Sequence, residues 1–495
     1  MKAPILGTVT ILAILAMPAC TKLQTYHAET PAEPCRVTAD RQGGKTCAYS
    51  SLVQRTYTAG KLQQEHDYYM AFVEFDDQGW FREPKQMERL LDFLNRSQKD
   101  EDFIIIVYAH GWRHNADACD NNVQCFQSLL ERLDFMERTL MDQSRKVVGV
   151  YVGWRGLSAT LEPFESMSFW DRKNTAQEVG LGGVTELLAR LNEFRSRDNP
   201  RRKGLGTHLI VTGHSFGAKV IYSALSHGLT ERAIPRQAAS LSPAKSFGDL
   251  VILINPAFEG ALYEPLHRVA VNRCYPERQR PVMMVVNSKA DWATRFAFPF
   301  GRTFSTLFES TSSDEQGEAL VRTVGHMDRY VTHELSLMDG KEPIPKTGDT
   351  GTCGCPYLAP IKDFVADFER QEGEEWQFYK ALVEEKRRFA PKKPSPGSEE
   401  KSADPAMDAY IVSEDLNRRD IAYGDRVHLT RFTKVREYEP NHPYFVVSTD
   451  EKLIPGHNEI YGEDVTNFVR RFYIRHIMER INFPPGPQCK APLNQ

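Results

Sequence analysis

The stretch THLIVTGHSFGAKVIYSAL, residues 207–225, decides the fold. Its apolar residues 209–211 predict a short buried strand, and the residues from Ala218 onward predict a helix. The sequence Gly-His-Ser-Phe-Gly between them has to reverse the chain within a few residues. Gly213 and Gly217 flank this turn, where the absence of a side chain lets neighbouring backbones pass without a clash. The stretch therefore predicts a strand, a tight turn and a helix in immediate succession.

Ser215 lies at the centre of this turn. A strained turn of this kind lifts the hydroxyl group into the open, and the N-terminus of the following helix favours developing negative charge. The five-residue pattern G-x-S-x-G is common by chance, and its alternative explanation is a purely structural tight turn. Its position between a strand and a helix predicts that Ser215 is a nucleophile.

Strands and helices alternate along much of the remaining chain. Further apolar runs predict strands at residues 69–75, 103–108, 147–152, 251–254, 282–286 and 444–447. Apolar residues at helical spacing predict helices around residues 87–94, 126–141, 172–196 and 465–472. Strands that are apolar throughout and alternate with helices predict an α/β fold, with a mostly parallel sheet covered by helices on both faces.

Two regions interrupt this alternation. Residues 20–65 are polar and rich in turns, so we expect a tether or a small N-terminal cap. Residues 292–440 predict a large insertion before the last strand, which would serve as a lid, a docking surface or both. The insertion contains an amphipathic helix around residues 361–368, and its prolines and mixed charges predict a flexible linker near residues 390–407. The core would then consist of residues 66–291 and 441–495.

The order of these elements and the G-x-S-x-G turn resemble the α/β-hydrolase superfamily. The sequence His110-Gly111-Trp112 and the run VYVGWRG are similar to those of poorly characterised bacterial members. The resemblance implies that the backbone N–H groups of Trp112 and Phe216 form an oxyanion hole, the pair of donors that stabilises a developing negative charge. We interpret the His110 side chain as structural, holding its loop by hydrogen bonds.

The carboxylate of a catalytic triad is expected after a later strand. Asp291 lies in the loop after the predicted strand 282–286, where the superfamily has this residue, whose task is to orient and stabilise an imidazole. A solvated loop aspartate is the alternative explanation. Glu259, in the sequence NPAFEG after the preceding strand, is a weaker candidate for the same role.

Two histidines are candidates for the general base, because both follow Asp291 in the chain order Ser…Asp…His. His326 is nearer in the sequence. His457 lies between the last predicted strand and the closing helix, which is how the superfamily ends. A long insertion between catalytic loops costs little, because loop-closure entropy grows slowly with length. We therefore expect His457 to be the base and keep His326 as the alternative, with His333 a more distant one.

Together these residues predict a serine hydrolase of the esterase or lipase-like kind, which cleaves a carboxylic ester through an acyl-enzyme intermediate. No metal or organic cofactor is expected. The substrate would be a small-molecule or lipid ester. The alternative is a non-catalytic scaffold or binding lipoprotein of the cell envelope on a hydrolase fold, with the insertion contacting an envelope protein.

The N-terminus, MKAPILGTVTILAILAMPAC, predicts export. Lys2 precedes an apolar run that ends in small residues, which predicts a signal peptide over residues 1–19. The end of this run resembles a bacterial lipobox, which implies that Cys20 is lipidated and anchors the protein to a membrane of the cell envelope, facing the periplasm. The alternative is a soluble periplasmic or secreted protein. The net charge of −4, without a long basic run, argues against nucleic acid as a partner.

The cysteines agree with export. The chain has nine, and without Cys20 the remaining eight form an even number that suits an oxidising compartment. Cys119 and Cys125 flank a short loop, and Cys35 and Cys47 could close another. Cys353 and Cys355 are too close for a relaxed mutual bridge, so we expect each to pair elsewhere. Zinc binding is the rival explanation for this pair, which we set aside because no second close pair or suitably spaced histidine accompanies it.

Overall fold

The structure is a computed structural model. It describes residues 24–38, 47–60, 64–140, 144–157, 164–197, 206–235, 242–276, 279–306, 309–346, 348, 353–369, 420–423, 426–439 and 441–478. The predicted signal peptide, Cys20 and the predicted linker at residues 390–407 lie outside the described residues.

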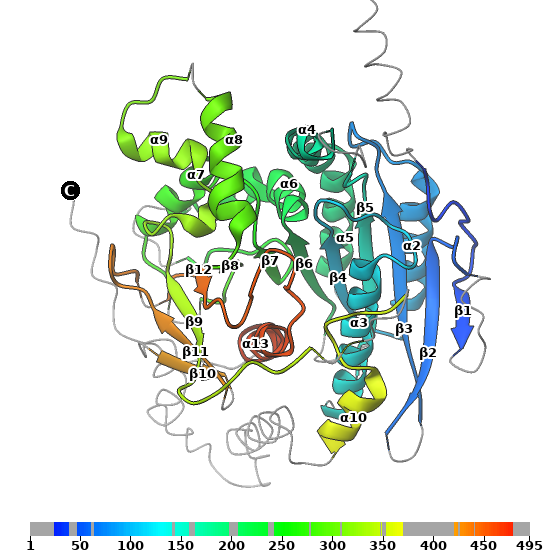
Figure 1. Ribbon diagram of the computed structural model, residues 1–495. Coiled ribbons are helices and arrows are strands. Elements are labelled where there is room, and N and C mark those ends of the chain that lie inside the picture. The colour runs from blue at the N-terminus through cyan, green and yellow to red at the C-terminus, as the bar shows by residue number, and fades with distance from the viewer. Residues whose placement is uncertain are drawn as a thin grey trace, which may run out of the picture.

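One sheet runs through the described chain (Figure 1). Its strands, in chain order, are β1 (Cys35–Thr38), β2 (Leu52–Ala59), β3 (Gln64–Glu74), β4 (Phe103–Ala109), β5 (Lys146–Gly153), β6 (His208–His214), β7 (Leu250–Ile254), β8 (Met283–Ser288), β9 (His333–Leu337), β10 (Asp420–Tyr423), β11 (Val427–Arg431) and β12 (Tyr444–Thr449). Their order across the sheet is β1-β2-β3-β5-β4-β6-β7-β8-β12-β9-β11-β10. All neighbours from β3 to β9 pair in parallel, which confirms the predicted mostly parallel sheet.

Helices cover both faces of this sheet. They are α2 (Pro84–Ser97), α3 (Asn121–Leu140), α4 (Phe164–Val179), η3 (Gly180–Val184), α5 (Thr185–Ser196), α6 (Phe216–Ala233), α7 (Gly260–Val271), η4 (Ala293–Ala297), α8 (Phe298–Ser305), α9 (Asp314–Val321), η5 (Val324–His326), α10 (Ile361–Glu369), α13 (Glu463–Tyr473) and η6 (Ile474–Met478).

Strand β4 shows how the two faces are filled. Successive side chains of a strand point to opposite faces, so an apolar run is stable only where both faces are covered. Ile105 and Val107 pack into the core that α2, α5 and α6 cover. Ile104 and Tyr108 pack into the second core, which α3, α10 and α13 cover. The predicted helices on both faces are therefore confirmed.

The helix predicted over residues 172–196 is interrupted. Gly182 has a non-helical backbone (φ −84°, ψ −132°), and η3 separates α4 from α5 at this point. A Cβ atom on Gly182 would lie 2.6 Å from the carbonyl oxygen of Gly79, which belongs to the turn after β3. The close approach of this turn explains the break, because only glycine leaves room for it.

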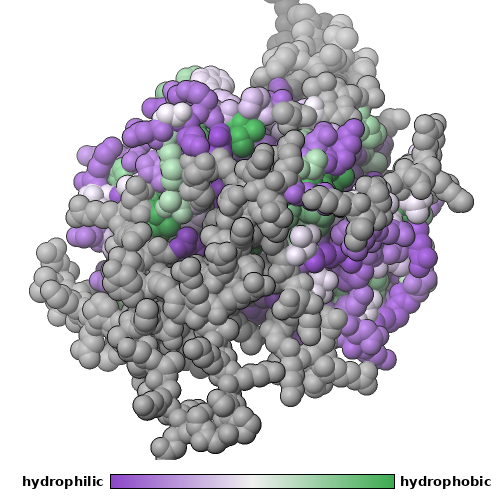
Figure 2. All heavy atoms as spheres, turned by 90° about the horizontal axis from the view of Figure 1, so that it is seen from below, coloured by the Kyte–Doolittle hydropathy of each residue, from purple (hydrophilic) through white to green (hydrophobic). Residues whose placement is uncertain are grey.

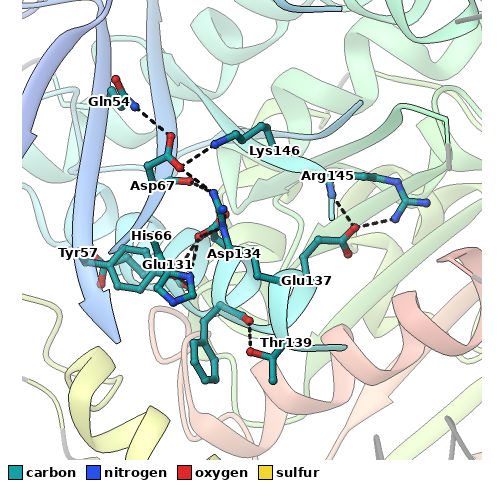
Figure 3. A network of polar contacts seen from close by, with 12 residues as sticks. Gln54, Tyr57, His66, Asp67, Glu131, Asp134, Glu137, Thr139, Arg145 and Lys146 are labelled. Carbon is teal, nitrogen blue, oxygen red and sulfur yellow. Dashed lines mark hydrogen bonds and ion pairs between the residues drawn. The ribbon is translucent and has the colours of Figure 1, made fainter. Parts of the chain in front are cut away.

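Residues 52–59 differ from the expectation of a tether, since they form strand β2 of the sheet. A network of polar contacts fixes it (Figure 3). Asp67 on β3 accepts hydrogen bonds from Gln54 of β2 (2.9 Å), from Arg138 of α3 (2.7 Å) and from Lys146 of β5 (2.7 Å). Burial opposes ionisation of Asp67, but these donors hold the pKa of its carboxyl below the ordinary value. The fold therefore begins before residue 66.

The region 292–440 also contributes to the sheet. Strand β9 pairs in parallel with β12, and β11 and β10 follow in antiparallel pairs. The amphipathic helix predicted near residues 361–368 is present as α10. β9 (HELSL) and β11 (VHLTR) are short and mix apolar with polar residues, because strands at the end of a sheet are not buried like central ones. Their sequences therefore give little sign of a strand.

Three disulfide bonds join pairs of cysteines that both lie among the described residues. Cys35 pairs with Cys47, as the sequence predicts. Cys353 and Cys355 each pair with a distant cysteine, Cys119 and Cys125 respectively, so the expectation that they do not bridge each other is confirmed. Disulfides are typical of proteins that fold in an oxidising compartment. Among the described helices, none is long and apolar enough to cross a membrane.

Candidate active site

The turn between β6 and α6 holds Ser215 in an uncommon backbone conformation. Ser215 has φ 56° and ψ −120°, a positive φ that a residue with a side chain adopts at a cost of about 1–3 kcal/mol. Its N–H donates to the carbonyl oxygen of Ile254 at the end of β7 (3.0 Å). Its own carbonyl oxygen accepts from the N–H of Ala257 (3.2 Å). These backbone bonds keep the strained turn in place.

The two glycines of the turn allow three backbones to approach one another. A Cβ atom on Gly217 would lie 2.0 Å from the carbonyl oxygen of Ala109 at the end of β4. A Cβ atom on Gly213 would lie 2.5 Å from the carbonyl oxygen of Gly217. A side chain at either position would push α6 away from the strands, so the glycines at 213 and 217 are required by packing.

The structure brings Ser215, His457 and Asp291 together from three separate loops. His457 Nδ1 lies 2.8 Å from Asp291 Oδ2, and His457 Nε2 lies 2.7 Å from Ser215 Oγ. Because a carboxylate only accepts, Nδ1 carries the proton. Nε2 is then free to accept a hydrogen bond from the Ser215 hydroxyl. This is the arrangement in which an imidazole can take a proton from serine.

Asp291 is fully buried behind the imidazole. Burial alone would favour the neutral acid, but His457 and two hydrogen bonds from Thr294 hold the pKa of its carboxyl below the ordinary value. The Thr294 hydroxyl donates to Oδ2 at 2.6 Å, and its backbone N–H donates to Oδ1 at 3.1 Å. Asp291 is therefore ionised at neutral pH, which suits a group that stabilises an imidazolium.

The loop that carries His457 is held by two residues that the sequence does not single out. The His214 ring donates from Nε2 to the carbonyl oxygen of His457 (2.9 Å). The Asn255 amide donates to the same oxygen (2.9 Å), and its Oδ1 accepts from the N–H of Ser288 (2.9 Å). Asn255 thereby connects the ends of β7 and β8 to the His457 loop. Its positive φ of 43° is the one sign of this special position.

Trp112 and Phe216, whose N–H groups are expected to form the oxyanion hole, share one aromatic cluster. Phe169 of α4 packs edge-on against Trp112 (5.4 Å between ring centres) and at a tilt against Phe216 (4.8 Å). The loop comes close to the serine at Gly111, where a Cβ atom would lie 2.9 Å from Ser215 Cβ. The loop after β4 and the start of α6 therefore meet beside Ser215.

The His110 side chain holds this loop. Its Nε2 accepts from the N–H of Trp154 (3.2 Å), and its Nδ1 donates to the carbonyl oxygen of Gly111 (2.9 Å). Burial lowers the pKa of His110 to about 4, so the ring is neutral at physiological pH, as these bonds require. The structural role expected for His110 agrees with these contacts.

His326, the alternative base, lies behind Asp291 rather than beside Ser215. Its Nε2 lies 2.9 Å from Thr294 Oγ1. Because the Thr294 hydroxyl gives its proton to Asp291, its oxygen accepts from His326. Burial lowers the pKa of His326 to about 4, which keeps it neutral. His326 thus reaches the acid through Thr294 and has no direct contact with the serine among the described hydrogen bonds.

The other two alternative residues lie in different surroundings. Glu259 is surrounded by cations: Lys173, Lys219 (3.6 Å) and Arg302 (3.0 Å) all form ion pairs with it. Burial opposes its charge, but these cations hold the pKa of Glu259 below the ordinary value. His333 lies in β9, where its ring stacks on Phe445. Neither side chain contacts His457 or Ser215 in the described hydrogen bonds.

Access to the three residues is uneven. Ser215 is 1% exposed and Asp291 is fully buried, whereas the His457 side chain is 19% exposed. Solvent therefore reaches the group on the His457 side. Within the described part of the chain, no cluster of three or more His, Cys, Asp or Glu side chains is arranged to hold a metal ion.

The strand order and direction make this an α/β-hydrolase-like fold, in which a strand, a sharp turn and a helix carry the serine. No protein-family model matches the sequence, and no curated protein sequence matches it. Among solved structures, it is similar to the phospholipase PlaB from Legionella pneumophila in complex with thio-NAD (12% identity, 48% of this chain and 47% of that chain covered, TM-score 0.21). It is also similar to an inhibited esterase B from Lactobacillus rhamnosis (16% identity, 52% and 72% covered, TM-score 0.17). The chain thus spans about half the length of the phospholipase.

Proposed function

We propose that the protein is a serine hydrolase that cleaves a carboxylic ester through an acyl-enzyme intermediate. The observation that supports this proposal most is the pair of hydrogen bonds that links Asp291, His457 and Ser215. Such a chain of an acid, an imidazole and a hydroxyl serves to activate a nucleophile. The strained backbone of Ser215 is a second support, because strain of this kind is concentrated at functional sites.

The mechanism follows from the roles of these groups. His457 takes the proton from the Ser215 hydroxyl as its oxygen attacks the ester carbonyl, and ionised Asp291 stabilises the imidazolium. The backbone N–H groups of Trp112 and Phe216 receive the negative charge on the carbonyl oxygen. His457 then gives its proton to the leaving alcohol. Water, activated by the same imidazole, releases the acid from the acyl-enzyme.

The protein is further proposed to act in the cell envelope, held by a lipid on Cys20 and facing the periplasm. The disulfides Cys119–Cys353 and Cys125–Cys355 support a site outside the cytoplasm, since such bonds persist in oxidising compartments. The predicted signal peptide and lipobox support the anchor.

A fluorophosphonate probe tests the chemistry directly, because it reacts only with an activated serine. We expect labelling of the wild-type chain and none of Ser215→Ala. His457→Ala should lower the labelling rate by about 10³-fold or more, whereas His326→Ala should lower it less than about tenfold, since His326 acts only through Thr294.

Hydrolysis of p-nitrophenyl esters of increasing chain length, measured on the same variants, would define the acyl group. Loss of activity in His326→Ala but not in His457→Ala would overturn the assignment of the base. A folded wild-type chain that is neither labelled nor active would contradict the proposal and favour the non-catalytic scaffold.

A further inference from the structure

Three exposed aromatic side chains, spaced four residues apart, begin directly after Asp291. Trp292 is 67% exposed, Phe296 is 54% exposed and Phe300 is 70% exposed. They lie on η4 and α8, where a spacing of four residues places side chains on roughly one face of a helix. Large aromatic groups gathered in this way at the surface mark a site of interaction.

The exposed apolar side chains of the described chain gather at one edge of the sheet. Besides these three aromatics, the carboxyl edge of the parallel strands carries four more: Tyr49, Trp80, Leu181 and Leu262. Only Ile234, at the end of α6, and Val435, after β11, lie at the opposite edge among the exposed large apolar residues described. Figure 2 views the molecule from that opposite side, where the described surface is mainly hydrophilic.

The topology of the sheet shows that each of these four residues lies at the carboxyl edge. Trp80 follows Gly79 in the turn after β3, and the Gly79 carbonyl accepts from the N–H of Gly183, which brings Leu181 to the same turn. Leu262 lies at the start of α7, after the end of β7. Tyr49 precedes β2, which is antiparallel to β3 and so begins where β3 ends.

The described chain also begins at this edge. The N–H groups of Tyr26 and His27 donate to the carboxylate of Glu74, the last residue of β3 (2.9 and 2.8 Å). Cys20 precedes Tyr26 by only a few residues, which span at most roughly 20 Å even when fully extended. A lipid on Cys20 would therefore hold this same edge next to the membrane. Figure 1 shows α4, α8 and α9 on this side of the molecule.

We propose that the carboxyl edge of the sheet is a docking surface for a lipid bilayer, with Trp292, Phe296 and Phe300 inserted at the level of the headgroups. Aromatic side chains favour the membrane–water interface, where an apolar ring and a polar edge are both satisfied. His457, the partly exposed member of the site, lies in the loop after β12 at this same edge, so docking would turn its exposed side toward the bilayer. That the substrate is a lipid ester of this bilayer rests on the proposed hydrolase chemistry; the docking surface does not.

The charges at this edge indicate whether the surface would bind zwitterionic or anionic lipids. Arg295 stacks over the Phe296 ring (5.3 Å). The neighbouring helix α9 carries Asp314, Glu315 and Glu318, and Glu315 and Glu318 pair with Arg329 and Arg322, so this helix and its partners bring no excess of positive charge beside the three aromatics. Docking would then depend on apolar burial rather than on attraction to anionic lipids, and we expect binding to zwitterionic vesicles that is insensitive to salt.

Co-sedimentation with vesicles of phosphatidylcholine and phosphatidylethanolamine tests this surface. The chain from residue 20 onward carries Cys20→Ser, so that no lipid anchor contributes. We expect it to bind at 0.1 M and at 1 M salt. Phe296→Glu together with Phe300→Glu should weaken binding roughly tenfold or more, which corresponds to about 1.4 kcal/mol for each factor of ten.

The matched control carries Ile234→Glu and Val435→Glu, which add the same charges at the opposite edge and should bind like the parent chain. Quenching of tryptophan fluorescence by brominated phosphatidylcholine needs no change in the surface and should occur in the parent chain. No vesicle binding by the parent, or equal loss in both double variants, would overturn the docking surface. A chain that binds vesicles but is not labelled by fluorophosphonate would support the surface and contradict only the proposed chemistry.

Discussion

Gly217 has two structural roles. It lies in the first turn of α6, two residues after the serine, and it lets the helix pass against the end of β4, with 2.0 Å between an added Cβ atom and the Ala109 carbonyl oxygen. Ala109 also leads into the loop of Gly111 and Trp112. The distance between the serine and that loop is therefore set by the missing side chain at residue 217.

Gly217→Ala is expected to destabilise the fold by at least about 2 kcal/mol, because backbone rather than a flexible side chain has to move. Urea unfolding measures this change, and the fluorophosphonate rate reports the displaced turn. Gly228→Ala is the matched control on the same helix: an added Cβ atom there meets nothing within 4 Å, so we expect stabilisation by about 0.5–1 kcal/mol. Equal effects of the two substitutions would refute the packing argument.

The sequence predicts the three side chains that the structure joins by hydrogen bonds, because each follows a buried strand that a pattern of apolar residues reveals. It does not predict His214 and Asn255. Both bind the backbone carbonyl of His457, more than 200 positions away in the chain. A contact to a backbone group needs no particular partner residue, so no sequence motif reveals it. Thr294 links Asp291 to His326 through its hydroxyl, and it is missed because a threonine three residues after an aspartate is no recognisable motif.

The prediction of whole elements succeeds where burial is complete. The central strands β4 to β8 are apolar runs, and the helical spacing of apolar residues predicts α2, α3 and α13. Strands β1, β2 and β9 to β11 lie toward the two ends of the sheet, where polar residues alternate with apolar ones or replace them. The regions expected to be a tether and an insertion therefore contain sheet strands that local sequence does not reveal.

Two disulfides join the start of α3 and the turn before it to the segment before α10. Cys119–Cys353 and Cys125–Cys355 close loops of nearly equal size, with sequence separations of 234 and 230 residues. Either bond alone already removes most of the conformational entropy that this long loop has in the unfolded chain. The second then closes only the small ring between the two bridges.

We expect the loss of both bonds to cost more than the sum of the two single losses, by about 2 kcal/mol. Cysteine pairs are replaced by alanine, one pair at a time and then together, and the free energy of unfolding is measured in urea. The pair Cys35–Cys47, with a separation of 12 residues, serves as an independent control whose loss should simply add. Additive losses for all three pairs would contradict this explanation.

Buried histidines couple the stability of the fold to pH. Burial lowers the pKa to about 4 or about 3 for seven of those described: His110, His208, His267, His326, His333, His442 and His476. In the unfolded chain the same groups have a pKa of about 6.5. Between these values the unfolded chain binds protons that the folded chain does not, so stability is full above pH 6.5 and falls as the pH decreases.

We expect the free energy of unfolding to decrease steadily from pH 7 to pH 5, with a slope of up to about 1.4 kcal/mol per pH unit for each such histidine. Urea unfolding at several pH values measures the slope. His208→Gln should reduce this slope by up to about 1.4 kcal/mol per pH unit, because it removes one of these buried groups. A stability that is constant over this range would contradict the neutral, buried state of these rings.

The position of β12 in the sheet means that the sheet and the site around Ser215 are completed last. This strand is the last of the described chain, yet it lies between β8 and β9, and the loop after it carries His457. During synthesis, Ser215 and Asp291 emerge long before the imidazole that joins them. Until residues 444–449 are added, β9 to β11 have no partner that links them to the other strands. A chain that ends before this strand therefore carries Ser215 without its imidazole partner, and the hydrogen bonds that join Asp291, His457 and Ser215 form only when the final strand closes the sheet.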